Sequence, residues 1–206
     1  MRIRVIAFFL ALAASTTVHA QSVVMGLRDN QYARAYYHSA KGWIAGYEQS
    51  LLNTKLEEQS GRIFTGYEFK RESWDVKAVA YCGSEYTGLW QAYGAWMEGA
   101  YQLHGFYFNA VINPHYDTGL DFSFCYQAEV GVSLWKKQKN NQKVEICVSY
   151  GNIPEYRMTV NSLRAGMKFI SRNLWVKPII SLPIANSDYG QNYVRVLCSF
   201  GWCFNL

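Results

Sequence analysis

The chain has 206 residues and a formal net charge of +5, a length that suits a single domain with its own core. Charged residues make up only 17%, below the roughly 25% of typical soluble domains, and Tyr is the commonest aromatic residue. The basic residues are scattered rather than clustered, which argues against nucleic acid as a partner.

The N-terminus has the pattern of an export signal. Arg2 and Arg4 form a basic segment, Val5 to Ala14 form a short apolar run, and Val18-His19-Ala20 resembles a cleavage site with small residues. The apolar run of about ten residues is too short for a membrane-spanning helix, which needs about 20. We therefore predict that residues 1–20 are a signal peptide that is removed on export.

Residues 21–42 show no clear alternation, and we interpret them as a periplasmic N-terminal arm with a helical segment around residues 32–39. From residue 43 to the C-terminus, apolar and polar residues alternate with a period of two, with breaks at Gly, Pro, Asn, Asp and Ser. This pattern predicts an all-β domain over residues 43–206 with about ten strands, and 8–12 as the range. The predicted strands are 43–52, 62–70, 74–83, 90–103, 106–113, 119–134, 143–151, 162–171, 174–183 and 192–206.

The clearest strand separates its side chains into an apolar and a polar face. Between Leu120 and Leu134 every second residue is apolar, from Phe122 to Val132, whereas Gln127 and Glu129 lie on the other face. The segment from Val194 to Leu206 repeats this division. An even number of such strands predicts a closed antiparallel up-and-down β-barrel.

Alternation alone does not say whether the apolar face points outward, since a soluble barrel shows the same period with its apolar side turned in. Aromatic residues favour a transmembrane β-barrel, because several lie toward predicted strand ends, where interfacial girdles occur. They are Trp43, Trp74, Trp90, Tyr107, Trp175 and Trp202. Connections near Arg71, His104, residues 136–142 and Arg172 are short on the whole, and the alternate connections are longer, as in outer-membrane barrels. Pro178 cannot donate to a ladder and predicts a local interruption of its strand.

The last eight residues, Ser199-Phe200-Gly201-Trp202-Cys203-Phe204-Asn205-Leu206, resemble the C-terminal β-signal of Gram-negative outer-membrane β-barrel proteins. The chain departs from the usual motif in ending on Leu206 instead of Phe. The resemblance implies location in the cell outer membrane, contact with the lipid bilayer, and recognition by the barrel-assembly machinery through Gly201, Phe204 and Leu206.

No motif in the chain predicts a cofactor or a metal site. His38, His104 and His115 are isolated, and the five cysteines lack C-x-x-C spacing, so we interpret the cysteines as small strand residues, with a disulfide left open. The sharpest enzymatic hint is Asn113-Pro114-His115-Tyr116-Asp117, which we place in an outer loop. Asn, Pro and Asp also serve ordinary turns, and no third group is evident to orient an activated nucleophile.

Charges of both signs on the polar faces predict a lumen charge network. Its expected members are Glu98, Asp121, Glu129, Arg164, Lys168 and Arg195. With about ten strands and the bulky residues Tyr107, Trp96 and Trp175 also placed inward, we expect a largely filled lumen and little steady conductance. The sequence therefore favours a non-enzymatic structural or surface-binding membrane component with an unknown surface ligand. The alternatives are a narrow pore for small molecules and, with less support, an enzyme at the barrel rim.

Deleting Phe204, Asn205 and Leu206 should abolish membrane assembly, because it removes two of the three residues of the predicted assembly signal. The measurement is the abundance of the protein in outer-membrane fractions and its heat-modifiable migration on a denaturing gel. Normal levels of folded, truncated protein would contradict the predicted signal.

Overall fold

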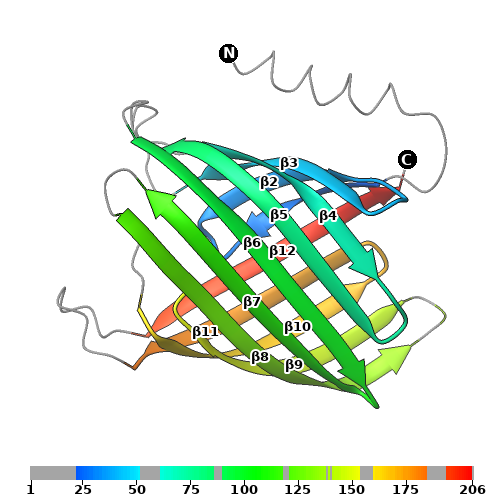
Figure 1. The fold of residues 1–206 in the computed structure, drawn as a ribbon. Coiled ribbons are helices and arrows are strands. Elements are labelled where there is room, and N and C mark those ends of the chain that lie inside the picture. Colours follow the sequence, from blue (N-terminus) through cyan, green and yellow to red (C-terminus); the bar gives the residue numbers. More distant parts are fainter. Residues whose placement is uncertain are drawn as a thin grey trace.

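The structure, a computed structural model, describes residues 22–51, 61–85, 90–117, 121–137, 139, 141–153, 160–184 and 194–205. The predicted signal peptide and Leu206 lie outside the described residues. The described residues form one closed antiparallel β-barrel (Figure 1). Within this part of the chain, no helix is long and apolar enough to span a membrane.

Twelve strands make up the barrel, each paired with the next in sequence. Their bounds are β1 Ser22–Arg28, β2 Tyr32–His38, β3 Trp43–Ser50, β4 Gly61–Lys70, β5 Trp74–Glu85, β6 Trp90–Leu103, β7 Phe106–Asp117, β8 Asp121–Lys137, β9 Gln142–Gly151, β10 Ser162–Ser171, β11 Leu174–Pro183 and β12 Arg195–Asn205. Closure comes from β1, which pairs with β12 from Ser22↔Asn205 to Leu27↔Phe200. The predicted fold class is confirmed, and the predicted strand number of ten is two too low.

The two missing strands lie in residues 21–42, and the interpretation of this segment as an arm is wrong. β1 pairs with both β2 and β12, so it is a full member of the wall. Alternation is hidden in β2 because its inward residues include Tyr36 as well as Arg34, whereas Ala33 and Ala35 face outward. Hydropathy therefore does not separate the two faces of this strand, although the backbone ladder is regular.

Every connection at one end of the barrel has at most four residues, and the longest connections lie at the other end, beside shorter ones at 29–31, 86–89 and 118–120. The end that carries Ser22 and Asn205 has connections 39–42, 71–73, 104–105, 138–141 and 172–173, and the opposite end includes connections 51–60, 152–161 and 184–194. In the tightest turn, His104 and Gly105 have φ of 46° and 89°, the left-handed conformation of a type I′ hairpin. The predicted turn over residues 136–142 shortens to four residues because β8 continues to Lys137.

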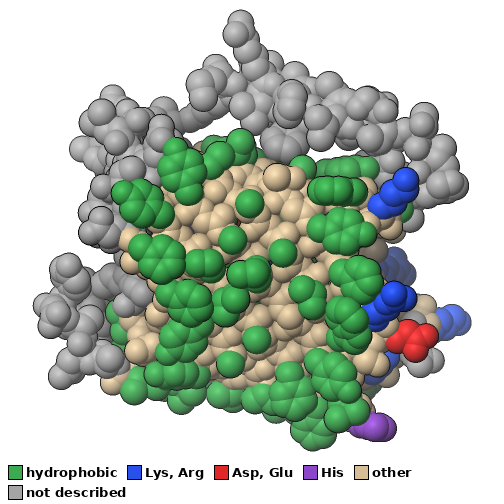
Figure 2. All heavy atoms as spheres, in the orientation of Figure 1, with side chains coloured by type: hydrophobic (Ala, Val, Ile, Leu, Met, Phe, Trp, Pro, Cys, Tyr) green, Lys and Arg blue, Asp and Glu red, His purple; other side chains and the backbone are tan. Residues whose placement is uncertain are grey.

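The outer surface is apolar and the inner surface is charged. Phe122 and Val196 are 67% and 66% exposed, and they alternate with residues such as Cys125 and Leu197 that are fully buried. Hydrophobic side chains cover the outer wall, and large rings gather toward both edges (Figure 2). Since charged side chains line the interior, the arrangement is the reverse of a soluble barrel and matches a wall that faces lipid.

Three of the six predicted girdle aromatics lie on the outer surface. Trp43, Trp74 and Trp202 are 59%, 42% and 52% exposed. Each of the three packs against another outer ring: Trp43 edge-on against Tyr67 at 5.5 Å between centroids, Trp74 against Phe69 at 5.5 Å, and Trp202 stacked on Phe204 at 5.3 Å. Tyr107 and Trp175 point into the barrel, which confirms their predicted inward position and rules out the girdle role that was also predicted for them. The side chain of Trp90 lies outside the described residues.

Two prolines interrupt the ladder where backbone hydrogen bonds are due. Leu103↔Phe106 closes the two-residue hairpin between β6 and β7, and from this pair every second pair of residues is hydrogen-bonded. By this alternation the next bonded position after Met97↔Ile112 places Ala95 opposite Pro114. Pro114 has no N–H, and the ladder is interrupted there; the side-chain Nδ2 of Asn113 donates to the Ala95 carbonyl instead, at 2.8 Å. Pro178 similarly interrupts the pairing of β10 with β11 opposite Met167, as the sequence predicted.

Replacing Asn113 with Ala should lower the free energy of unfolding by about 1–3 kcal/mol, because the Ala95 carbonyl loses its donor. Adding Pro114→Ala should recover part of this loss, since the new backbone N–H can donate to the same carbonyl. The measurement is denaturant unfolding of the refolded barrel in micelles. Equal stability of the single and double variants would show that Asn113 does not replace the missing ladder bond.

Candidate functional site

The barrel interior contains a cavity of about 460 Å³. Seven basic and seven acidic residues are among the 30 that line it. The wall has a mean radius of 12 Å about the barrel axis. The lumen therefore contains open space, and the sequence-based expectation of a largely filled lumen is not supported. Two more strands than predicted give a wider interior, because barrel diameter grows with strand number.

Two bulky inward rings lie over glycines of the neighbouring strand, whereas a third, Trp96, packs against Val111, Cys125 and Ile153 and lies 5.6 Å from the Arg28 guanidinium of β1. Trp175 is the cross-strand partner of Gly201, where an added Cβ would lie 2.6 Å from Nε1 of the indole. Tyr107 covers Gly131 in the same way, again as its cross-strand partner. Such aromatic–glycine pairs hold the rings against the wall. Gly201, predicted as part of the assembly signal, thus also has a packing role.

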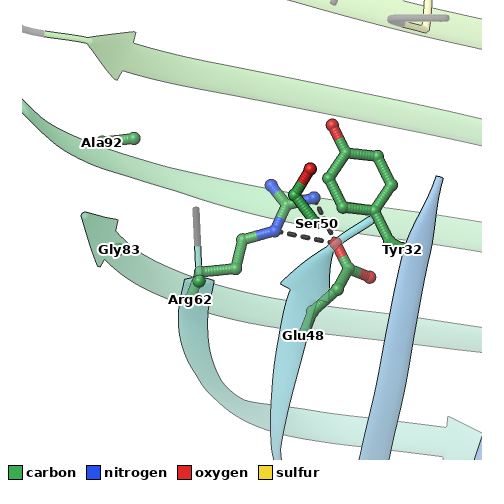
Figure 3. A pocket seen from close by; sticks show the side chains of 7 residues that line it. Tyr32, Glu48, Ser50, Arg62, Gly83 and Ala92 are labelled. Carbon is green, nitrogen blue, oxygen red and sulfur yellow. Dashed lines mark hydrogen bonds and ion pairs between the residues drawn. The ribbon is translucent and has the colours of Figure 1, made fainter. Parts of the chain in front are cut away.

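At the end with the longer connections, Glu48 binds two arginines. Arg28, the last residue of β1, contacts both oxygens of the Glu48 carboxylate, with Nη2–Oε1 at 2.8 Å and Nε–Oε2 at 3.2 Å. Arg62 on β4 donates from Nε to the same Oε1 at 2.9 Å (Figure 3). Both guanidinium groups also lie over the Tyr32 ring, at 4.3 and 5.3 Å. This cluster links β1, β2, β3 and β4 from the inside.

A second ion pair spans strands that are not neighbours. Lys177 on β11 lies 2.6 and 2.8 Å from the two carboxylate oxygens of Glu129 on β8, and Tyr107 donates its hydroxyl to Glu129 at 3.1 Å. Because β9 and β10 separate β8 from β11, this pair crosses part of the lumen.

A third ion pair joins neighbouring strands. Lys77 on β5 lies 3.1 Å from the Glu98 carboxylate on β6. Asn109 on β7 adds a hydrogen bond of 3.0 Å to Glu98. The inward carboxylates of these two clusters are therefore held by ammonium and amide groups from other strands.

The structure places five members of the predicted charge network on the inner face. Glu98 and Glu129 pair with Lys77 and Lys177, which the predicted set omits. Arg164 donates to Gln127 and to the Ile153 carbonyl, at 2.6 and 2.8 Å. Lys168 lies 5.6 Å from the Trp175 ring centroid, and Arg195 is 2% exposed. The side chain of Asp121 lies outside the described residues.

Sequence reasoning missed the arginines of β1 and β2. Arg28 and Arg34 line the cavity, but both lie in the segment that lacked alternation. The period of two could have identified Arg34, because it places this residue on one face of residues 32–38 with Tyr32 and Tyr36, opposite Ala33 and Ala35.

Residues 113–117, which the sequence analysis places in an outer loop, form the end of β7, so the predicted loop is wrong. Asn113 is 5% exposed and bonds Tyr81 Oη at 2.9 Å as well as Ala95, so its role is structural. His115 contacts the Asn113 carbonyl oxygen at 3.3 Å through Nδ1, and the side chain of Asp117 is not among those described. In the described part of the chain, no group of three or more His, Cys, Asp or Glu side chains could hold a metal ion, and the five cysteines are free thiols.

No protein-family model matches the chain, and no curated protein sequence matches it. Its fold is similar to that of KdgM porin, with a TM-score of 0.52 at 10% identity over 91% of this chain and 99% of that chain. The structure of KdgM porin in complex with disordered oligogalacturonate gives the same score and coverage at 9% identity. NanC porin is similar over 91% of this chain and 100% of that chain, with a TM-score of 0.48 and 13% identity. The chain therefore shares with KdgM porin the fold of a closed antiparallel β-barrel.

Replacing Glu48 with Gln should lower the free energy of unfolding by about 3–5 kcal/mol, because two inward arginines lose their shared carboxylate. The measurement is denaturant unfolding in micelles. Glu72→Gln, in the exposed turn between β4 and β5, is the matched control and should be neutral. A loss for Glu48→Gln no larger than that for the control would show that the cluster contributes nothing to stability.

Proposed function

We propose that this protein is a narrow pore that lets small hydrophilic solutes diffuse across the outer membrane. The observation that carries the proposal is the cavity of about 460 Å³ inside the closed wall, with fourteen charged residues around it. Charged groups that remain ionised inside a barrel require water or partners, because burying a lone charge is costly. A hydrated lumen meets that need and is also a path for polar solutes.

A purely structural barrel is the weaker reading, because such a barrel has no need for open space along its axis. Rings at Gly131 and Gly201 lie against the wall instead of meeting in the middle. A rim enzyme finds little support in the described residues, since Asn113 has a structural role and His115 contacts a backbone carbonyl.

The similar fold of KdgM porin, whose name describes a porin, adds support from a different direction. At 10% identity that likeness concerns the fold, so the solutes of this pore must be argued from its own residues. Export through residues 1–20 and insertion through the C-terminal segment are part of the same proposal.

Purified protein in planar bilayers should give discrete, stable current steps, smaller than those of porins with about 16 to 18 strands. Ala100 lines the cavity, so Ala100→Trp should reduce the step size by filling the lumen. The matched control is Gly99→Trp, one residue earlier and on the other face of β6, where an added Cβ meets no atom within 4 Å.

The control variant should keep the wild-type step size, because its indole enters lipid. A refolded, heat-modifiable barrel without current steps would overturn the pore proposal. Equal step sizes for the Ala100 variant and the wild type would show that the current does not pass through this cavity.

A further inference from the structure

The charges of the lumen are segregated across the barrel. In the closed strand order, β10, β11, β12, β1 and β2 are consecutive, and these five strands contain no Asp or Glu. Their six Arg and Lys residues all face inward, and we call them the basic wall: Arg28, Arg34, Arg164, Lys168, Lys177 and Arg195. Asp29, in the turn after β1, accepts a hydrogen bond from Ser199 and is the one acidic cavity residue beside this wall.

The remaining strands supply the opposite charge. Among the side chains that the structure describes, six inward carboxylates lie on β3 to β9, and we call them the acidic wall: Glu48, Glu68, Asp75, Glu98, Glu129 and Glu145. Three basic side chains of these strands, Arg62, Lys77 and Lys143, each pair with a carboxylate of the same wall. The cations of the acidic wall are therefore locally neutralised.

Two cations of the basic wall keep their charge available to the cavity. Arg34 and Lys168 form no ion pair within the described chain. The Arg34 guanidinium lies 5.7 Å from the Tyr36 ring centroid, and the Lys168 ammonium lies 5.6 Å from the Trp175 ring centroid. Nε of Arg34 is buried and has no hydrogen-bond partner. Both cations line the same cavity as Glu98.

The acidic wall has a corresponding free anion. Asp75 lines the cavity and forms no ion pair with the described residues, whereas Glu98, Glu129 and Glu145 each bind a lysine. Equal numbers of acidic and basic residues give the lining no net charge, so a simple anion or cation gains little from the lumen as a whole. A field directed from one wall to the other instead favours a molecule that carries both charges.

Resting on the proposed pore, we infer that the lumen recognises small dipolar solutes that carry a carboxylate and an ammonium group, as amino acids do. The carboxylate turns toward Arg34 and Lys168, and the ammonium group turns toward the acidic wall, where Asp75 is unpaired. Alignment in the transverse field offsets the loss of hydration on entering the lumen.

Liposome swelling tests this inference with β-alanine as the dipolar probe and glycerol as a neutral probe of similar size. The ratio of the swelling rate with β-alanine to that with glycerol should be about fivefold higher for the wild-type protein than for an uncharged pore. One ion pair in water-like surroundings is worth about this factor. Arg34→Gln/Lys168→Gln should remove this preference while glycerol still enters. The double variant should also shift the reversal potential in a KCl gradient toward cation selectivity.

Lys41→Gln/Lys136→Gln removes the same charge at exposed positions outside the lumen and should keep the wild-type preference. No swelling with either probe would refute the pore itself. Swelling by glycerol with no preference for β-alanine, or a preference that survives in the Arg34 and Lys168 variant, would refute the dipolar inference alone. Galacturonate and galactose are a third pair of probes. A preference for galacturonate over galactose that exceeds the preference for β-alanine over glycerol would mean that the lumen selects anions, which also overturns the dipolar inference.

Discussion

Closure of the backbone ladder is the constraint on which the rest of this structure depends. An unsatisfied backbone group in hydrocarbon costs several kcal/mol, so a membrane-spanning sheet has to close on itself. The pairing of β1 with β12 provides that closure and leaves no open edge in the wall. The two proline interruptions show how strictly the constraint acts, since at Pro114 a neighbouring amide side chain donates the hydrogen bond that the backbone lacks.

Closure also determines what faces the lumen. Because successive side chains point to opposite faces, each strand places every second residue inside, and lipid on the other side leaves the interior as the only site for ionised groups. Pairing of β1 with β12 then brings Arg28 and Arg34 next to the strands that carry Lys177 and Arg195. A basic wall of five consecutive strands exists only because the two ends of the chain meet.

The inner wall combines local pairing with open space. Ion pairs such as Lys177 with Glu129 and Arg28 with Glu48 stabilise inward charges across strands, and rings over glycines keep aromatic side chains away from the axis. Twelve strands widen the interior relative to ten, because barrel diameter grows with strand number. The open space inside the barrel thus follows from two more strands than expected and from where four residues, Tyr107, Gly131, Trp175 and Gly201, lie relative to one another.

The sequence by itself determined the all-β class, the two faces of the long strands, and the inward position of Glu98, Glu129, Arg164, Lys168 and Arg195, because a period of two is a local property of the chain. It also indicated which connections share an end and that Pro178 interrupts its ladder. Only the tertiary structure decided that β1 and β2 belong to the wall, since β2 carries tyrosines inside and alanines outside and is recognised by its hydrogen-bonded partners. Which charges pair, and that the five strands without Asp or Glu lie side by side, likewise depends on strand order around the closed barrel, because residues far apart in sequence become neighbours only when the last strand meets the first.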